Sequence, residues 1–406
     1  MTHQLLRRFA AATAVVLALG GAATAVLAQG QGPVQAETSS WQIPGWSFTP
    51  GVTVSAIFDS NVALATAPAD VQRTQGDQLF IVEPFGSLEY LSPRTEFTSG
   101  YRGFMRRYVD ITQLNGFDQR GYASVRHLLS RRVSLFAKDS YLDVPTTDEV
   151  ELNGVPFTRI GSRSNNFSGG VDARLTKFTS LSAQYDLMWV KFDRTEAFLT
   201  GGFVNGFRTN LRQHINERLS VGGEYSIRLA DLDKGLRQLT FQDAGGTLEY
   251  VLTSHTSVSA AGGVSHLIDR TTNFSRTGPY VRGGVTRTGE RVTAGASYER
   301  MFVPSFGFGG SNQSQELRTF VHMPFQRNRW YVDGSVAWRR SNPFVANELR
   351  LDTYWVRSTL GYGLSRWLRL EGFYAFSRQD SQVTGGEVNR HRGGMQIVIS
   401  QPMRIH

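Results

Sequence analysis

Arginine supplies most of the side chains in this sequence that could act on a ligand. The 406 residues hold 43 Lys and Arg against 34 Asp and Glu, which gives a formal net charge of +9. Lysine stands only at positions 138, 177, 191 and 234, so nearly all of the positive charge is guanidinium. A guanidinium presents a fixed fork of donors that fits carboxylate, sulfate or phosphate. The chemistry that these residues favour is therefore the binding of anions.

Sequence patterns of catalysis and metal binding are missing. The eight histidines include no pair spaced four residues apart and no HExxH. The chain also lacks a GxSxG turn, a phosphate-binding loop and a dinucleotide fingerprint. It contains no cysteine, so it folds without disulfides. We therefore expect no enzyme activity, no cofactor and no metal site.

Strict alternation of apolar and polar residues indicates the elements that carry the arginines. From Leu219 to Leu229 the odd positions are Leu, Val, Gly, Tyr, Ile and Leu, whereas the even positions are Ser, Gly, Glu, Ser and Arg. The stretches 181–189, 292–299 and 330–339 alternate in the same way. A period of two residues is typical of a β-strand with one apolar face.

Such strands recur in pairs around short turns, with a period of about 36 to 46 residues that is read as an internal repeat. The turn centres lie near Pro93, Arg131, Lys177, Glu217, Ser254, Gly289, Arg327 and Arg366. Alternating stretches at Phe48–Phe58 and Arg390–Ser400 stand before and after them. We predict an all-β fold, a transmembrane antiparallel β-barrel of about 18 strands, with 16 as the alternative. Closure removes free edges, and the apolar face meets lipid.

The connections between strands carry further predictions. Short periplasmic turns should alternate strictly with longer extracellular loops. The alternation slips near Asp243 and near 353–355, which suggests bulges or strand ends. The loop from Asp143 to Arg163 could fold inward or bind divalent ions, but solvation is the simpler reading. The last strand should end near Ile399, without the terminal aromatic residue of many bacterial barrels.

Residues opposite to the apolar face are expected to line the lumen, where rings of arginine select anions. The cationic lumen positions predicted to contact an anion or polysaccharide are Arg102, Arg106, Arg120, Arg126, Arg208, Arg212, Arg228, Arg282, Arg318 and Arg339. For each single arginine, pairing with an acid on a neighbouring strand remains the alternative. Aromatic residues on the apolar face should form a girdle at headgroup level. They are Tyr185, Trp189, Tyr225, Tyr250, Tyr298, Trp330, Trp338 and Tyr374.

The N-terminus predicts export. Arg7 and Arg8, an apolar stretch and Val26–Ala28 match a secretory signal spanning 1–28, with cleavage between Ala28 and Gln29. A flexible periplasmic segment, 29–46, should precede the barrel at 47–406. We expect the outer membrane of a Gram-negative bacterium, with outer-membrane lipid, lipopolysaccharide and the barrel assembly machinery as partners. Export argues against nucleic acid.

Three segments resemble the β-barrel porin-2 family of outer-membrane proteins. They are FTPGVTVSAIFDSNV at 48–62, HLLSRRVSLFAKDSYLDVPTTDE at 127–149 and RIGSRSNNFSGGVDARLTKFTSLSAQYDLMWVKFD at 159–193. Members of that family often accompany polysaccharide export machinery, so the resemblance implies an outlet for an exopolysaccharide, with export components as further partners. The leading hypothesis is a cationic channel for an anionic polymer. The alternatives are a passive porin for small anionic solutes and a plugged structural or adhesive barrel.

Overall fold

The computed structural model describes residues 45–62, 64, 76–146, 154–157, 159–193, 199–307, 310–326, 329–344, 350–381 and 386–405. In these residues the secondary structure is almost entirely β. The long strands are β1 (Gly45–Asp59), β2 (Asp77–Leu91), β3 (Thr95–Tyr108), β4 (Gly116–Leu128), β5 (Val133–Pro145), β6 (Gly161–Arg174), β7 (Thr179–Phe192), β8 (Gly202–His214), β9 (Leu219–Leu232), β10 (Arg237–Thr253), β11 (Thr256–Asp269), β12 (Phe274–Thr288), β13 (Thr293–Pro304), β14 (Ser311–Phe325), β15 (Trp330–Pro343), β16 (Leu351–Gly363), β17 (Leu368–Ser381) and β18 (Gly386–Ser400). Two single-turn 3₁₀ helices, η1 (Thr112–Leu114) and η3 (Asp233–Gly235), lie between strands.

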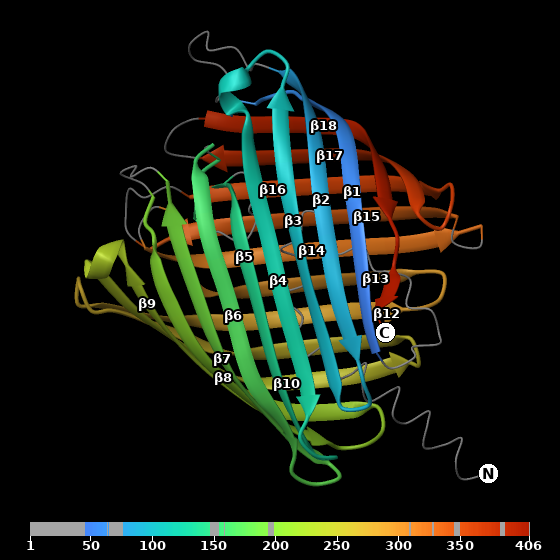
Figure 1. The fold of residues 1–406 in the computed structure, drawn as a ribbon. Helices are drawn as coiled ribbons and strands as arrows, with labels where there is room; N and C mark the ends of the chain where they lie inside the picture. Colours follow the sequence, from blue (N-terminus) through green and yellow to red (C-terminus); the bar gives the residue numbers. More distant parts are fainter. Residues whose placement is uncertain are drawn as a thin grey trace, which may run out of the picture.

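These strands form one closed antiparallel barrel. Each strand pairs with the next along the chain, and β18 pairs back to β1 from Gly51↔Ser400 to Asp59↔Arg392. In Figure 1, strands β1 to β7 cross in front of the more distant strands β12 to β18, which run at a steep angle to them. The prediction of an 18-stranded barrel is confirmed.

Side-chain exposure follows the alternation read from the sequence. On β1, Thr53 and Ser55 are 2% exposed, whereas their neighbours Val54 and Phe58 are 46% and 54% exposed. The apolar set therefore faces outward and the polar set faces the lumen. This arrangement satisfies the backbone between strands and leaves an apolar outer surface, as a bilayer requires.

The two ends of the barrel differ in their connections. All eight predicted turns join strands at one end, here called the turn end, and both described chain ends lie there too. The opposite end, here called the loop end, carries the other connections. The predicted strict alternation of lengths is wrong, because 233–236 and 270–273 at the loop end are as short as the turns.

Three sequence predictions need correction. The strand pairing is continuous through Asp243 and through 353–355, so neither site is a bulge. The register shift in β10 lies instead between Val251 and Thr253. The chain also does not end its pairing at Ser400: a short strand, β19 (Met403–Ile405), pairs with the start of β1, from Trp46↔Ile405 to Phe48↔Met403. Residues 45 and 46, assigned from the sequence to the N-terminal segment, thus belong to β1.

One seam of the barrel is incomplete. β12 pairs with β11 along its whole length to Phe274, but its pairing with β13 stops at Val281↔Arg300. Beyond this point β13 continues with β14 and leaves β12. Gly278 of β12 packs on the ring of Phe302, and Arg276 lies 5.0 Å over the ring of Phe344, which follows β15. At the loop end, β12 therefore overlaps the outer face of the β13–β15 wall.

Candidate functional site

A group of charged side chains from β1–β4 and β16–β18 lies near the middle of the lumen. Arg102 and Arg120 come from β3 and β4, and Arg357 and Arg392 come from β16 and β18, each near the centre of its strand. Arg102 contacts Glu83 at 3.3 Å. The charges that act most strongly on Arg357 include those of Arg392, Arg120 and Glu83. Guanidinium groups from β3–β4 and from β16–β18 thus lie close together in the lumen. The sequence predicts this, because the alternation places these residues on the inner face of the barrel.

Carboxylates and polar side chains lie among these arginines. Asp59 pairs with Arg390 at 2.6 Å and with Arg392 at 3.7 Å, and it is completely buried. Glu371 accepts hydrogen bonds from Tyr331 and Gln396. The group, here called the central arginine group, contains Arg102, Arg120, Arg357, Arg390 and Arg392 together with Glu83, Glu371 and Asp59. Its guanidinium groups outnumber its carboxylates.

Most of the other predicted lumen arginines pair with acids on the inner wall. The pairs are Arg106–Asp118 (2.7 Å), Arg126–Asp172 (3.3 Å), Arg212–Glu249 (2.7 Å), Arg228–Asp243 (2.8 Å), Arg282–Glu224 (2.7 Å) and Arg339–Glu316 (2.6 Å), and Arg318 also pairs with Glu316. Cross-strand pairing, the alternative considered for each single arginine, is thus the common arrangement. Arg208 and Lys138 differ, because neither makes an ion pair with any described residue.

The accessibility of the inner wall is uneven. Toward β18 and β1 the inward side chains are packed, and Thr53, Ser55 and Gln396 are buried. From β4 to β9 many of the polar side chains that point inward are partly exposed; among them are Arg126, Lys138, Ser168, Gln184, Asp186, Arg208 and Asn210. The inner wall along β4–β9, where Arg208 and Lys138 lie, is therefore accessible to water.

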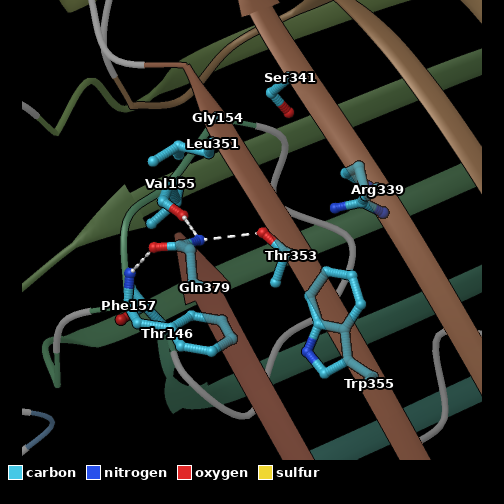
Figure 2. A pocket seen from close by; sticks show the side chains of 10 residues that line it. All are labelled: Thr146, Gly154, Val155, Phe157, Arg339, Ser341, Leu351, Thr353, Trp355 and Gln379. Atoms are coloured by element: carbon cyan, nitrogen blue, oxygen red, sulfur yellow. Dashed lines mark hydrogen bonds between the residues drawn. The ribbon is translucent and has the colours of Figure 1, made fainter. Parts of the chain in front are cut away.

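The loop between β5 and β6 folds into the barrel, so the prediction of a solvated loop is wrong for its described residues. Val155 and Ile160 are buried. Figure 2 shows Gln379 of β17 bridging this segment to the opposite wall. Its side chain accepts a hydrogen bond from the Phe157 N–H (2.6 Å) and donates to the Val155 carbonyl (3.3 Å) and the Thr353 hydroxyl (3.1 Å).

Aromatic and cationic contacts hold the same segment. The ring of Phe157 lies 6.3 Å from that of Trp355 on β16. Arg159 donates to the Val62 carbonyl and lies 5.1 Å over the ring of Tyr108. The described residues 154–157 and 159–160 thus extend from β6 to the walls formed by β3 and by β16–β17, and they narrow the loop end of the lumen.

A second segment enters the lumen from the incomplete seam. Phe302 and Phe306 are almost fully buried, together with Leu239, Phe241 and Leu267 of the inner wall. Side chains replace the missing strand pairing: the Phe302 carbonyl accepts from Arg228 (2.8 Å), and the Phe302 N–H donates to Ser265 (3.4 Å). Asp243 in turn accepts hydrogen bonds from both Arg228 and Ser265. The seam is therefore a specifically bonded structure.

This inner packing explains the apparent slips in the sequence pattern. Leu239 and Phe241 precede Asp243 at inward positions, and Trp355 is inward as well. They are apolar because the chain itself covers them. In the sequence these residues are visible as apolar side chains at positions that face the lumen. Without knowledge of the loops that cover them, the alternation pattern predicts irregular strand pairing at such positions.

The predicted aromatic girdle is outward-facing but does not form two rings. Tyr250 and Trp330 lie near the turn end, Trp189 and Trp338 lie toward the loop end, and Tyr185, Tyr225, Tyr298 and Tyr374 stand within the middle of their strands. Aromatic contacts concentrate at the turn end. Trp46 lies 4.7 Å from Tyr90 and 5.9 Å from Phe97, and Trp330 lies 4.5 Å from Tyr362.

The described residues contain neither a metal-binding cluster nor a membrane-spanning helix. Within the described part of the chain, no three His, Asp or Glu side chains come together to hold a metal ion. None of the helices among the described residues is long and apolar enough to cross a membrane. The predicted signal sequence, with Ala28 and Gln29, lies outside the described residues.

Comparison with known proteins adds a likeness of fold. No family model and no curated protein matches the chain, so the resemblance to the porin-2 family stays a prediction. Similar solved structures include OpdQ of Pseudomonas aeruginosa (TM-score 0.46, 8% identity, 88% of this chain and 98% of that chain), OccAB4 of Acinetobacter baumannii (0.45, 11%, 89% and 99%) and the outer membrane protein opdK of Pseudomonas aeruginosa (0.44, 12%, 88% and 99%). Likeness at this level concerns only the arrangement of strands, so the function must be inferred from the protein's own inner wall.

Proposed function

We propose that this protein is an outer-membrane porin through which small anionic solutes diffuse. The observation that carries the proposal is the presence of two inward cations without ion pairs on the β4–β9 sector of the inner wall. Lys138 and Arg208 make no ion pair among the described residues. On the same sector, Asp186 is an inward acid that likewise makes no ion pair with a described residue. Fixed cations on a pore wall raise the local concentration of anions and lower their entry barrier.

The same geometry favours small solutes over a polymer. The segments at 154–157 and 305–307 meet at the loop end. The second segment is also held by the Thr200 N–H, which lies before β8 and donates to the Phe306 carbonyl at 2.8 Å. Gly307 lies against the Gly154 carbonyl, with no room there for a Cβ atom. A hydrated polysaccharide strand would have to displace both segments, whereas a small acid can pass along β4–β9. Polysaccharide export, the leading hypothesis from the sequence, is therefore less well supported than the passive porin.

The apolar outer face supports the location. Outward residues such as Phe80, Phe203, Val264 and Met395 are 50% to 60% exposed. On a soluble protein so extensive an apolar surface would drive association, whereas in a bilayer it is the surface that contacts lipid. The proposal therefore includes the outer membrane as the location. It also includes lipopolysaccharide and the barrel assembly machinery as partners.

Solute flux into proteoliposomes tests the proposal. Small mono- and dicarboxylates should enter faster than neutral sugars of similar size. The variant Lys138→Gln/Arg208→Gln should lose most of that preference, because it removes the cations that have no ion-pair partner. Lys191→Gln is the matched control, since Lys191 lies on β7 with outward parity and is exposed. Equal entry of acids and sugars into the unaltered protein would contradict the proposal, and so would no entry of either.

A further inference from the structure

The turn end of the barrel carries a ring of exposed bases. Arg131, Arg132, Lys177, Arg218, Arg329 and Arg366 all lie in the connections at this end and are exposed. We call these six residues the turn collar. Glu217 and Glu290 are the only acids in the sequence of the eight turns. None of the collar residues makes an ion pair with a described residue.

The loop end of the outer surface differs sharply. Several of its arginines are held in ion pairs: Arg163 contacts Asp143 at 3.5 Å, Arg350 contacts Asp352 at 3.0 Å, and Arg378 contacts Glu387 at 2.9 Å. Other bases there, such as Arg107, Lys234 and Arg270, are exposed, but the exposed acids Asp110, Asp231 and Asp233 lie at the same end. Among the described residues, the loop end therefore mixes charges of both signs, whereas the turns at the other end carry mainly bases.

Large apolar side chains accompany the collar. Leu129, Phe178, Ile215, Leu364 and Trp367 lie in the same turns, each between 51% and 58% exposed. A turn that only contacts water or a hydrated polymer gains nothing from such residues. At a bilayer surface, by contrast, the apolar side chain enters the acyl region while the neighbouring base reaches the phosphate level.

The aromatic contacts place the membrane boundary at this level. The cluster of Trp46, Tyr90 and Phe97 and the pair of Trp330 and Tyr362 lie on strand ends that adjoin the turns. Tryptophan and tyrosine concentrate at the headgroup region of bilayers. The bases of the turns, a few residues further along the chain, then stand beside lipid phosphates.

We infer that the turn collar binds the headgroups of anionic phospholipids in the leaflet that surrounds the turn end. The ligand class is a phosphodiester lipid with a net negative charge, such as phosphatidylglycerol. Each base near such a surface gains a favourable electrostatic interaction that salt weakens. This inference rests on the membrane location in the proposed function but not on conduction, so each can fail without the other.

Lipid selectivity measured by electron spin resonance tests the inference. The full-length protein is reconstituted in phosphatidylcholine vesicles that contain trace spin-labelled phosphatidylglycerol or phosphatidylcholine. The motionally restricted fraction should show a several-fold preference for phosphatidylglycerol, and high salt should reduce it. The variant Arg131→Gln/Arg132→Gln/Lys177→Gln/Arg366→Gln should bring the preference close to parity.

A matched variant at the other end controls for net charge. Arg163→Gln/Arg340→Gln/Arg350→Gln/Arg378→Gln removes the same number of bases from the loop end and should retain the preference. Circular dichroism of both variants reports that the barrel is folded. Three results would overturn the inference. The first is no preference for phosphatidylglycerol in the unaltered protein, and the second is an equal loss of that preference in both variants. The third is a collar variant that keeps the preference for phosphatidylglycerol but loses binding to isolated anionic cell-wall polymer, because the collar would then bind the polymer instead of lipid.

Discussion

The two ends of this barrel differ in whether protein covers the apolar residues that set them apart. At the loop end, Phe241 and Leu267 point inward and are completely buried by segments of the same chain. At the turn end, Phe178 and Trp367 are exposed outside, next to bases. The hydrophobic effect acts in both places, but the covering material differs: protein at the loop end and, by our account, lipid at the turn end. The direction of an apolar residue thus reports what lies against it.

The largest effect is expected from breaking the side-chain bonds that replace the β12–β13 pairing. In Asp243→Ala, the largely buried Arg228 loses its carboxylate, and Ser265 loses its acceptor. Breaking a buried ion pair typically costs about 3–5 kcal/mol. We expect a loss of that size in the free energy of unfolding, measured by denaturant titration in lipid vesicles.

The control lies on the exposed surface of the loop end. Asp380 pairs with Arg378, but both side chains are more than one-third exposed. Such pairs contribute roughly 0–1 kcal/mol. If Asp380→Ala destabilised the barrel as strongly as Asp243→Ala, the β12–β13 seam would have no special role.

A slightly smaller loss should follow removal of the ring that fills the loop end. Phe302 is 1% exposed and packs edge-on against Phe344 at 4.8 Å. Phe302→Ala should lower the free energy of unfolding by about 3–4 kcal/mol through lost burial and a cavity. Phe178→Ala, at the turn end, should change it by no more than about 0.5 kcal/mol in detergent. Equal losses would show that the inner packing does not distinguish the two ends.

A still smaller change is expected at the bridge formed by Gln379. Gln379→Ala removes three hydrogen bonds to residues 155, 157 and 353 and leaves the Phe157 N–H and the Val155 carbonyl without this partner. The expected cost is about 1–3 kcal/mol. Because the segment 154–157 narrows the lumen, single-channel conductance should also rise. Unchanged conductance would show that the segment does not limit passage.

The barrel itself could be read from the sequence because alternation and turn spacing are local properties of the chain. All eight turn positions and the parity of the lumen arginines required no knowledge of distant contacts. The inward loop could not be predicted, since Val155 and Phe157 are held against the wall by Gln379, more than two hundred residues away. The open seam was missed for the same reason. Pro279 and Gly278 in β12 do weaken a strand edge, but neither residue predicts that β13 leaves it.

The distribution of free and paired cations was equally beyond the sequence. Arg126 and Arg208 look alike in their alternating strands, yet Asp172 neutralises only the first. Register across neighbouring strands decides which arginine meets an acid. The sequence therefore predicts a cationic wall but not which of its cations stay available to a solute.

The reversal potential across a planar bilayer with a gradient of potassium chloride tests the central claim most directly. A lumen with more accessible cations than carboxylates should let chloride cross more readily than potassium, and the potential should take the sign of anion selectivity. Conductance with the sign of cation selectivity, or no conductance from the folded protein, would contradict the account.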